Sequence, residues 1–276
     1  MTERPSAASP ILYADLDGTL LGPGGSLFAT PDGHTTEAAE ALGALHTAGV
    51  SLVLVSGRTR EQMREAARIL QADAYIAELG ALIVERPDEV ITNFGEFRAR
   101  GTPFDAMARS GAGGFLLERY AGRLEPHTPW SLEHRDATML FRGFLDPTEA
   151  SVTLAKAGYD WMELLDNGLI LRSYPTLAVR EVRAYHLVPR GVSKATGVRR
   201  HRERRRAAMA RTAVIGDSLS DALVAAEVGR AFIVGSDENT LELGAVRPEN
   251  LELVEDAVGL GFAKAVRTLL DEWRGL

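Results

Sequence analysis

Blocks of apolar and polar residues alternate along the first part of the chain in an order that predicts strands and helices in turn. Three short, continuous apolar runs lie at Ile11–Ala14, Ser51–Val55 and Tyr75–Ala77. Runs of this kind are typical of strands buried on both faces of a parallel sheet. Between them, apolar residues recur at helical spacing over 38–45 and 63–70, and Gly49 is placed to end the first helix. This β-α-β-α-β order predicts an open α/β sheet.

The same pattern returns after residue 190. We expect a helix from Lys194, a strand at Thr212–Ile215, a short helix at Ala222–Val228, a strand at Ala231–Val234 and a closing amphipathic helix at Ala257–Trp273. The stretch between the two parts differs, with expected strands at Met139–Leu145, Leu169–Arg172 and Arg183–Val188 and a helix at Thr148–Ala157. We therefore predict a core formed by residues 1–86 and 190–276, with a smaller α+β domain of residues 87–189 inserted into it.

Composition narrows the class of protein. Of the 276 residues, 45% are hydrophobic and 25% charged, so the chain can bury a sizeable core and wholesale disorder is excluded. The net charge of -7 disfavours nucleic acid and anionic membranes as partners, and the arginines of 199–206 are spaced as on a solvated helix. No apolar run approaches the ~20 residues of a membrane helix. The lack of cysteine excludes thiolate chemistry and fits a cytoplasmic protein, with monomer and dimer both open.

Carboxylates follow two of the predicted strands. Asp15-Leu16-Asp17-Gly18-Thr19 comes directly after the first strand, and Gly216-Asp217 through Asp221 follows the strand at 212–215. Open α/β sheets bind ligands at this end of their strands. Four acids at one edge would repel one another unless a divalent cation offset their charge, and carboxylate oxygens suit Mg²⁺. The alternatives are a polar turn after the first strand and a helix cap after the second, and Asp221 could cap while Asp217 binds metal.

Two further segments offer anion-binding groups. Ser56-Gly57 lies between the second strand and a helix, where a hydroxyl and free backbone N–H groups can hold an anion. A simple capped turn explains this segment about equally well. Lys194 follows the inserted region, and a lone lysine is most often a solvated surface charge.

Taken together and in chain order, these segments resemble the four motifs of the haloacid dehalogenase superfamily of phosphotransferases. Asp15-Leu16-Asp17-Gly18-Thr19 matches the first motif, Ser56 the second, Lys194 the third, and Gly216-Asp217 through Asp221 the fourth. The resemblance covers about two thirds of the chain. The position of the insertion is similar to members with a C2-type cap, which include Cof-like, sucrose-phosphate, trehalose-phosphate and mannosyl-phosphoglycerate phosphatases and phosphomannomutase. Departures from the common pattern are Ala195, Ser220 and Leu79 in Glu78-Leu79-Gly80-Ala81.

The resemblance implies a fold and a set of roles. The core would be an open, Rossmann-like parallel sheet, and the insert a cap that selects the substrate. Asp15 would be the nucleophile and Asp17 the general acid and base. The resemblance implies Mg²⁺ held by Asp15, Asp17 (through its carbonyl), Asp217 and Asp221. It also implies phosphoryl oxygens held by Thr19, Ser56, Gly57 and Lys194.

Substrate selection is expected in the insert. The candidates are Glu133, His134, Arg135, Arg142, Asp166, Asn167 and His186, and we retain Glu133, Arg135, Arg142 and His186 as substrate-contacting residues. The alternatives are a solvated connection around 133–136, a hairpin turn at Asp166-Asn167-Gly168 and a structural histidine at 186. We expect a Mg²⁺-dependent phosphomonoester hydrolase for a small phosphorylated metabolite, most plausibly a sugar phosphate. A sugar phosphomutase and a non-catalytic metabolite-binding protein are the alternatives.

Overall fold

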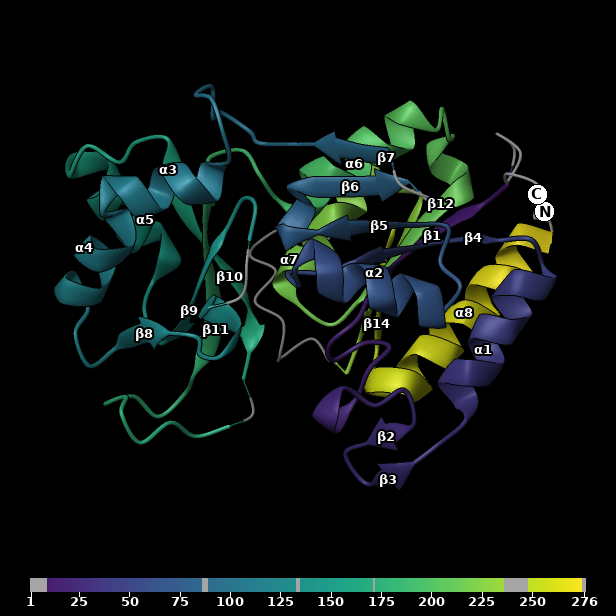
Figure 1. Cartoon of the computed structure of the whole chain (residues 1–276). Coiled ribbons are helices and arrows are strands. Elements are labelled where there is room, and N and C mark those ends of the chain that lie inside the picture. Colours follow the sequence, from purple (N-terminus) through teal and green to yellow (C-terminus); the bar gives the residue numbers. More distant parts are fainter. Residues whose placement is uncertain (1–8, 86–88, 133–134, 171, 236–247, 275–276) are drawn as a thin grey trace.

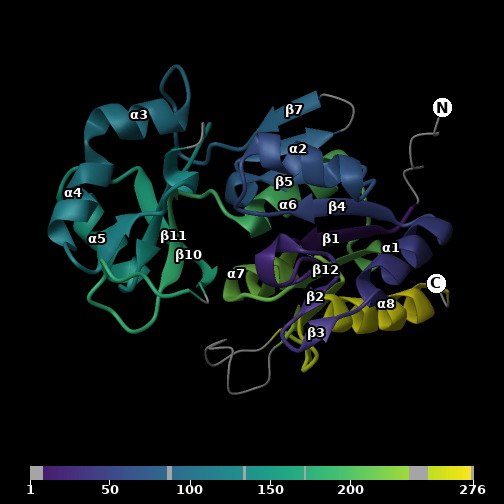
Figure 2. The same cartoon turned by 60° about the horizontal axis from the view of Figure 1, so that its bottom comes forward.

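Two separate sheets organise the chain, in a computed structural model that describes residues 9–85, 89–132, 135–170, 172–235 and 248–274 (Figure 1). The larger sheet has eight strands in the order β14-β13-β12-β1-β4-β5-β6-β7, and the smaller has four in the order β10-β11-β9-β8. A short hairpin pairs β2 (Ala29–Thr30) with β3 (Gly33–His34). Figure 2 shows from a second direction that the smaller sheet and its helices lie to one side of the larger sheet.

Parallel strands form the centre of the larger sheet. They are β1 (Ile11–Asp15), β4 (Ser51–Val55), β5 (Ala74–Ala77), β12 (Thr212–Gly216), β13 (Arg230–Val234) and β14 (Leu251–Val254). Their pairing is parallel throughout, and only β6 (Leu82–Glu85) and β7 (Glu89–Thr92) join antiparallel at one edge. These strands confirm the predicted open α/β sheet, including the strands expected near residues 11, 51, 75, 212 and 231.

Helices cover both faces of this sheet, as the continuous apolar runs require. The helices are α1 (Glu37–Thr47), α2 (Arg60–Ile69), α6 (Lys194–Arg204), α7 (Leu219–Ala222) and α8 (Val258–Arg274). On β1, Leu12 and Ala14 are buried with residues of α1, α2 and α8, whereas Ile11 and Tyr13 are buried with residues of α6 and of 222–228. The expected helix at Ala222–Val228 is instead α7 followed by a 3₁₀ helix at Leu223–Glu227.

The smaller sheet is antiparallel and carries helices on one face. Its strands are β8 (Leu124–Pro126), β9 (Met139–Gly143), β10 (Met162–Leu169) and β11 (Arg183–Pro189), and its helices α3 (Pro103–Ser110), α4 (Ala112–Arg119) and α5 (Pro147–Lys156). On β11, Tyr185 and Leu187 are buried with residues of these helices, and Val188 is buried with residues of the larger sheet. Because strand residues alternate, His186 shares the face of Val188, toward the larger sheet.

Two expectations for the middle of the chain are wrong. The strand expected at Leu169–Arg172 lies earlier in the chain. β10 begins at Met162, runs through the Asp166-Asn167-Gly168 segment that was weighed as a hairpin turn, and ends at Leu169. The register with β11 shifts between Asp166 and Leu169, so a bulge absorbs the turn-forming residues without ending the strand. The insertion also begins later than residue 87, because β7 pairs with β6 and extends the larger sheet.

None of the helices in the described part of the chain combines the length and apolar character that crossing a membrane requires.

Close helix packing around Gly197 yields a test of the fold. A Cβ on Gly197 of α6 would lie 2.7 Å from the Cα of Gly80 and 3.0 Å from Cγ2 of Ile76, whereas one on Gly43 of α1 would meet nothing within 4 Å. Gly197→Ala should lower the free energy of unfolding by about 1–3 kcal/mol through overpacking. Gly43→Ala should raise it by about 0.5–1 kcal/mol, because only helix propensity changes. Urea denaturation of both variants measures this, and equal effects would contradict the packing of α6.

Candidate active site

The topology brings three sequence motifs to one edge of the larger sheet. β12, β1 and β4 are neighbours, and Asp217, Ser56 and the residues after Asp15 follow directly from their carboxyl ends. Ala14 pairs with Ile215 and Asp15 pairs with Val55, so the three strands end at the same level. The motifs therefore meet although some 200 residues of sequence separate Asp15 from Asp217.

Two glycines allow the acidic side chains to approach the backbone. Gly18 has a φ of +88°, and a Cβ there would lie 2.1 Å from Oδ2 of Asp217. A Cβ on Gly216 would lie 2.2 Å from the Cβ and Cγ atoms of Asp221. Any larger residue at either position would displace a carboxylate from the site.

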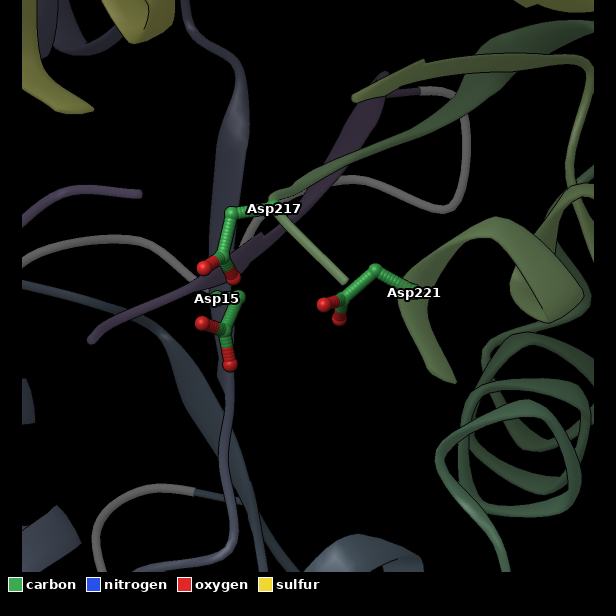
Figure 3. Close-up of side chains that lie close together, drawn as sticks. All are labelled: Asp15, Asp217 and Asp221. Carbon is green, nitrogen blue, oxygen red and sulfur yellow. The ribbon is translucent and has the colours of Figure 1, made fainter. Parts of the chain in front are cut away.

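Asp15, Asp217 and Asp221 form a compact group of carboxylates (Figure 3). Each offers an oxygen that lies within 4.8 Å of those of the other two. Lys194, the first residue of α6, donates from Nζ to Oδ1 of Asp15 at 2.9 Å and to Oδ1 of Asp221 at 2.8 Å. Asp15 is 4% exposed and Lys194 3%, so the ion pairs are almost fully withdrawn from water. Lys194 is therefore a buried partner of the acids, not a solvated surface charge.

The second oxygen of Asp221 is also engaged. Oδ2 accepts hydrogen bonds from the backbone N–H of Ser218 at 3.3 Å and from its hydroxyl at 2.5 Å, which closes a capping box at the start of α7. Asp221 therefore combines the helix cap that sequence reasoning weighed with an ion pair to Lys194. This leaves Asp15 and Asp217 as the less encumbered carboxylates of the group.

Burial and mutual repulsion shift the ionisation of this group. Burial raises the pKa of Asp15 well above its usual value, opposed by Lys194 and reinforced by Asp221 and Asp217. Burial and the charge of Asp221 raise the pKa of Asp217 to about 7. Burial disfavours the ammonium of Lys194, but Asp15 and Asp221 outweigh it and raise the pKa of the amine. Three clustered carboxylates beside one ammonium, which is bonded to two of them, make a donor set of oxygens with excess negative charge, and such a set fits a divalent cation such as Mg²⁺.

Asp17 lies outside this group of carboxylates. Its Oδ2 accepts from Nε of Arg58 at 2.8 Å and its Oδ1 accepts from the terminal nitrogen of Arg58 at 2.6 Å. The Asp17 side chain is 57% exposed, in contrast to Asp15. Sequence reasoning did not assign a role to Arg58, although it directly follows the Ser56-Gly57 segment. A metal-binding role for Asp17 thus remains confined to its main-chain carbonyl, as the resemblance implied.

The predicted anion-binding residues lie around the same edge. The Thr19 hydroxyl is buried and lies 3.5 Å from Oδ1 of Asp217. Ser56 is buried, and its Oγ accepts from the backbone N–H of Arg58 at 3.3 Å. α2 follows immediately, with Thr59 as its N-cap. Ser56 and Gly57 therefore precede the amino end of a helix on the strand that neighbours β1, where an anion is favoured.

The candidates in the inserted domain separate into two groups. Arg135 and His186 lie at the contact with the larger sheet: Arg135 donates to the carbonyl of Gly57 at 3.1 Å, and a Cβ on Gly57 would lie 2.9 Å from Nε2 of His186. Asn167 joins them, since its Nδ2 would lie 2.8 Å from that Cβ. Burial, with Arg135 next, lowers the pKa of His186 well below its usual value, so the ring is neutral.

Arg142 and Asp166 are engaged by other residues of the inserted domain. Arg142 donates to Glu125 at 2.7 Å and to the Thr128 carbonyl at 2.9 Å, and its guanidinium stacks on Tyr174, all within the inserted domain. These contacts engage Nε and one terminal nitrogen of Arg142 within that domain and do not support the expectation that it contacts substrate. Asp166 is paired with Arg183 on the neighbouring strand. Glu133 and His134 lie outside the described residues.

Glu78 is a residue of the site that sequence reasoning did not assign. It is fully buried, and its carboxylate accepts hydrogen bonds from residues 136–138 of the inserted domain. The available signal was the Glu78-Leu79-Gly80-Ala81 segment, whose acid follows the buried strand β5.

Comparison with known proteins agrees with the geometry. Residues 12–94 match the model of the haloacid dehalogenase-like hydrolase family. No curated protein matches the sequence. Among solved structures, a Thermoplasma acidophilum protein (0175) has a TM-score of 0.63 at 17% identity, covering 95% of this chain and 99% of that chain. The sucrose-phosphatase of Synechocystis sp. PCC6803 has a TM-score of 0.63 at 16% identity, covering 95% and 98%.

A further solved structure has the same fold. The phosphatase BT1666 from Bacteroides thetaiotaomicron has a TM-score of 0.62 at 16% identity, covering 99% of this chain and 98% of that chain. The chain shares its fold with these three solved structures. The match of residues 12–94 to the haloacid dehalogenase-like hydrolase model agrees with the resemblance that the motifs predicted.

The raised pKa of Asp217 predicts how stability depends on pH. The folded protein holds this proton more tightly than the unfolded chain, so the free energy of unfolding falls as the pH rises from about 4 through about 7. Asp217→Asn removes the titrating carboxyl group, so the free energy of unfolding should not fall for this reason as the pH rises. In chelator-treated protein, the variant should gain about 1–3 kcal/mol over wild type between pH 5 and pH 8.

Urea denaturation at both pH values measures the gain. Glu149→Gln, which neutralises an exposed carboxylate near the start of α5, is the matched control and should show no such gain. A pH-independent difference between wild type and Asp217→Asn would contradict the raised pKa of Asp217.

Proposed function

We propose that the protein is a Mg²⁺-dependent phosphomonoesterase that acts on a small phosphorylated metabolite through an aspartyl-phosphate on Asp15. The observation that carries this proposal is the cluster of Asp15, Asp217 and Asp221 at the carboxyl edge of the parallel sheet, with Lys194 bonded to Asp15 and Asp221. A protein that only bound a metabolite would have no chemical need for a buried carboxylate held by an amine. The match to a hydrolase family supports an enzyme.

A sugar phosphate is the substrate class that we propose. One structurally similar protein is a sucrose-phosphatase that was solved with sucrose and phosphate. We propose further that the domain between Thr92 and Arg190 selects the leaving group. His186 and Asn167 support this, since both come from that domain and lie against Gly57 beside the phosphate-binding residues.

The reaction that we propose has two displacements on phosphorus. An oxygen of Asp15 attacks, the bond from phosphorus to the leaving oxygen breaks, and Asp17 gives its proton to that oxygen. Asp17 then takes a proton from water, whose oxygen attacks phosphorus, and inorganic phosphate leaves with Asp15 restored. Lys194 would stay bonded to Asp15 and Asp221, so that the nucleophile is held in one orientation.

The residues that would hold Mg²⁺ are Asp15, Asp217 and the main-chain carbonyl of Asp17, with Asp221 acting through Lys194. The bound cation would offset negative charge, so that an anionic nucleophile can approach an anionic phosphoryl group. Thr19, Ser56, the Gly57 N–H and Lys194 would hold the phosphoryl oxygens, at positions where hydrogen bonds strengthen as charge develops.

Arg58 gives Asp17 a defined resting state. Both carboxylate oxygens of Asp17 accept from Arg58, and this pairing holds the carboxylate against the guanidinium. We expect substrate binding to replace at least one of these hydrogen bonds, so that Asp17 can turn toward the leaving oxygen. The partial exposure of both side chains makes that exchange inexpensive, because exposed ion pairs contribute little stability.

Replacing the nucleophile tests the proposal. Asp15→Asn should abolish Mg²⁺-dependent phosphate release, because the amide cannot form the phosphoaspartate. A panel of phosphorylated metabolites and an aryl phosphate serve as substrates, with phosphate release as the readout and circular dichroism to confirm the fold. Activity close to that of wild type in Asp15→Asn would exclude this residue as the nucleophile.

Replacing the general acid should have a graded effect. Asp17→Asn should slow turnover by about 10²–10⁴-fold for an alkyl phosphate, which needs protonation of its leaving group. The loss should be smaller for an aryl phosphate, because its leaving phenolate oxygen is a weaker base and depends less on protonation. An equal loss on both substrates would argue that Asp17 has no role in proton transfer to the leaving group.

A further inference from the structure

The carboxylate of Glu78 joins the core to the inserted domain. Its Oε1 accepts from the backbone N–H of Asp136 at 2.8 Å, and its Oε2 accepts from the N–H groups of Ala137 at 3.0 Å and Thr138 at 2.8 Å. The Thr138 hydroxyl adds a fourth hydrogen bond at 2.9 Å. One buried acid thus binds three consecutive peptide groups from a segment about sixty residues away in sequence. Charge-assisted bonds of this kind are about twice as strong as neutral ones.

Arg135 immediately precedes that segment and reaches the phosphate-binding turn. It is 2% exposed, and one terminal nitrogen donates both to the carbonyl of Gly57 at 3.1 Å and to the Thr138 hydroxyl oxygen at 3.0 Å. The guanidinium also compensates the buried Glu78, whose pKa burial raises and Arg135 opposes. Glu78 therefore fixes the backbone that carries Arg135, and Arg135 neutralises the charge that does so.

The contact at Gly57 bears directly on the Ser56 hydroxyl. The carbonyl of Gly57 and the N–H of Arg58 belong to one peptide group. Arg135 holds its oxygen, and Oγ of Ser56 accepts from its N–H at 3.3 Å. A hydroxyl that accepts in this way still has its own hydrogen to donate. Arg135 thus polarises the peptide group that orients Ser56 and leaves the Ser56 proton available to an anion.

From these contacts we propose that Arg135 is a positioning residue for the phosphate-binding turn. Glu78 would hold the backbone next to Arg135 in place, so that the Ser56-Gly57 turn is fully ordered only while the inserted domain is docked on the core. The assignment rests on the proposed function only in identifying Ser56-Gly57 as phosphate-binding. It couples substrate selection by the inserted domain to phosphate binding in the core. An inserted domain that docks poorly on a wrong substrate would leave Ser56 misoriented.

Arg142 provides a matched control for Arg135. Both are arginines of the inserted domain with little exposure and with hydrogen bonds from the guanidinium, but the contacts described above for Arg142 stay within that domain. Arg135→Met and Arg142→Met should both lower the midpoint of thermal unfolding. Only Arg135→Met should weaken inhibition by orthovanadate, a phosphate-like anion, by about tenfold, the size expected for one hydrogen bond to a charged group. Equal inhibition constants in wild type and Arg135→Met would overturn the proposal.

Hydrogen exchange separates this proposal from the proposed function. In wild type, the amides of 136–138 should be protected, and Arg135→Met should increase deuterium uptake over 56–60 whereas Arg142→Met should not. Glu78→Gln should increase uptake over both 136–138 and 56–60, because its amide group cannot accept all four hydrogen bonds. Uptake that rises over 136–138 alone would show that the two segments are not coupled and would overturn the proposal.

Arg135→Lys covers the case in which Arg135→Met does not fold. It keeps the charge and one donor, so it should restore part of the protection over 56–60 and part of the orthovanadate inhibition. A folded Arg135→Lys that behaves as wild type would show that the charge alone suffices and that the guanidinium contact to Gly57 has no positioning role. If wild type released no phosphate from any substrate, the proposed function would fail, while the exchange data would still decide the coupling.

Discussion

The structure depends on burying like charges beside one another. Asp15, Asp217 and Asp221 lie within a few ångströms of one another, Asp15 and Asp221 buried and Asp217 half-buried. In the described part of the chain, Lys194 is the cation that is bonded to this cluster, through Asp15 and Asp221. Such a cluster costs free energy in the absence of a cation, as the raised pKa values of Asp15 and Asp217 indicate. The surrounding fold must supply that free energy. The same electrostatic imbalance is the physical basis of the proposal that this edge binds a divalent cation and, with it, a phosphoryl group.

The parallel sheet offsets this free-energy cost because it holds the acids at the ends of well-packed, buried strands. β1 is buried on both faces and ends at Asp15, in register with the strands that lead to Asp217 and Ser56. Gly18 and Gly216 leave the space that the carboxylates occupy. The inserted domain contributes a second buried charge, Arg135, which opposes the charge of Glu78 and donates to the carbonyl of Gly57 in the proposed phosphate-binding turn. Each domain thus places a charged side chain at the contact with the other, Glu78 from the core and Arg135 from the inserted domain.

Local signals were sufficient to predict the core and its acids, because strand ends and glycine turns are encoded in adjacent residues. Asp15, Asp217 and Lys194 come together as the motif order implied. The contacts of Asp17 and Glu78 could not be predicted, since each is made with a segment whose position depends on tertiary docking. The turn residues 166–168 misled for the same reason: pairing with β11 outweighed their local preference and extended β10.

The central claim is that Asp15 carries the phosphoryl group during turnover. Borohydride reduces an aspartyl-phosphate to homoserine, so quenching the Mg²⁺-loaded enzyme with borohydride during turnover records where the phosphoryl group resides. The account predicts homoserine at position 15 in the mass spectrum of the peptide that contains it, and only when substrate is present. Rapid phosphate release with an unmodified residue 15, or homoserine at position 217 or 221, would contradict it.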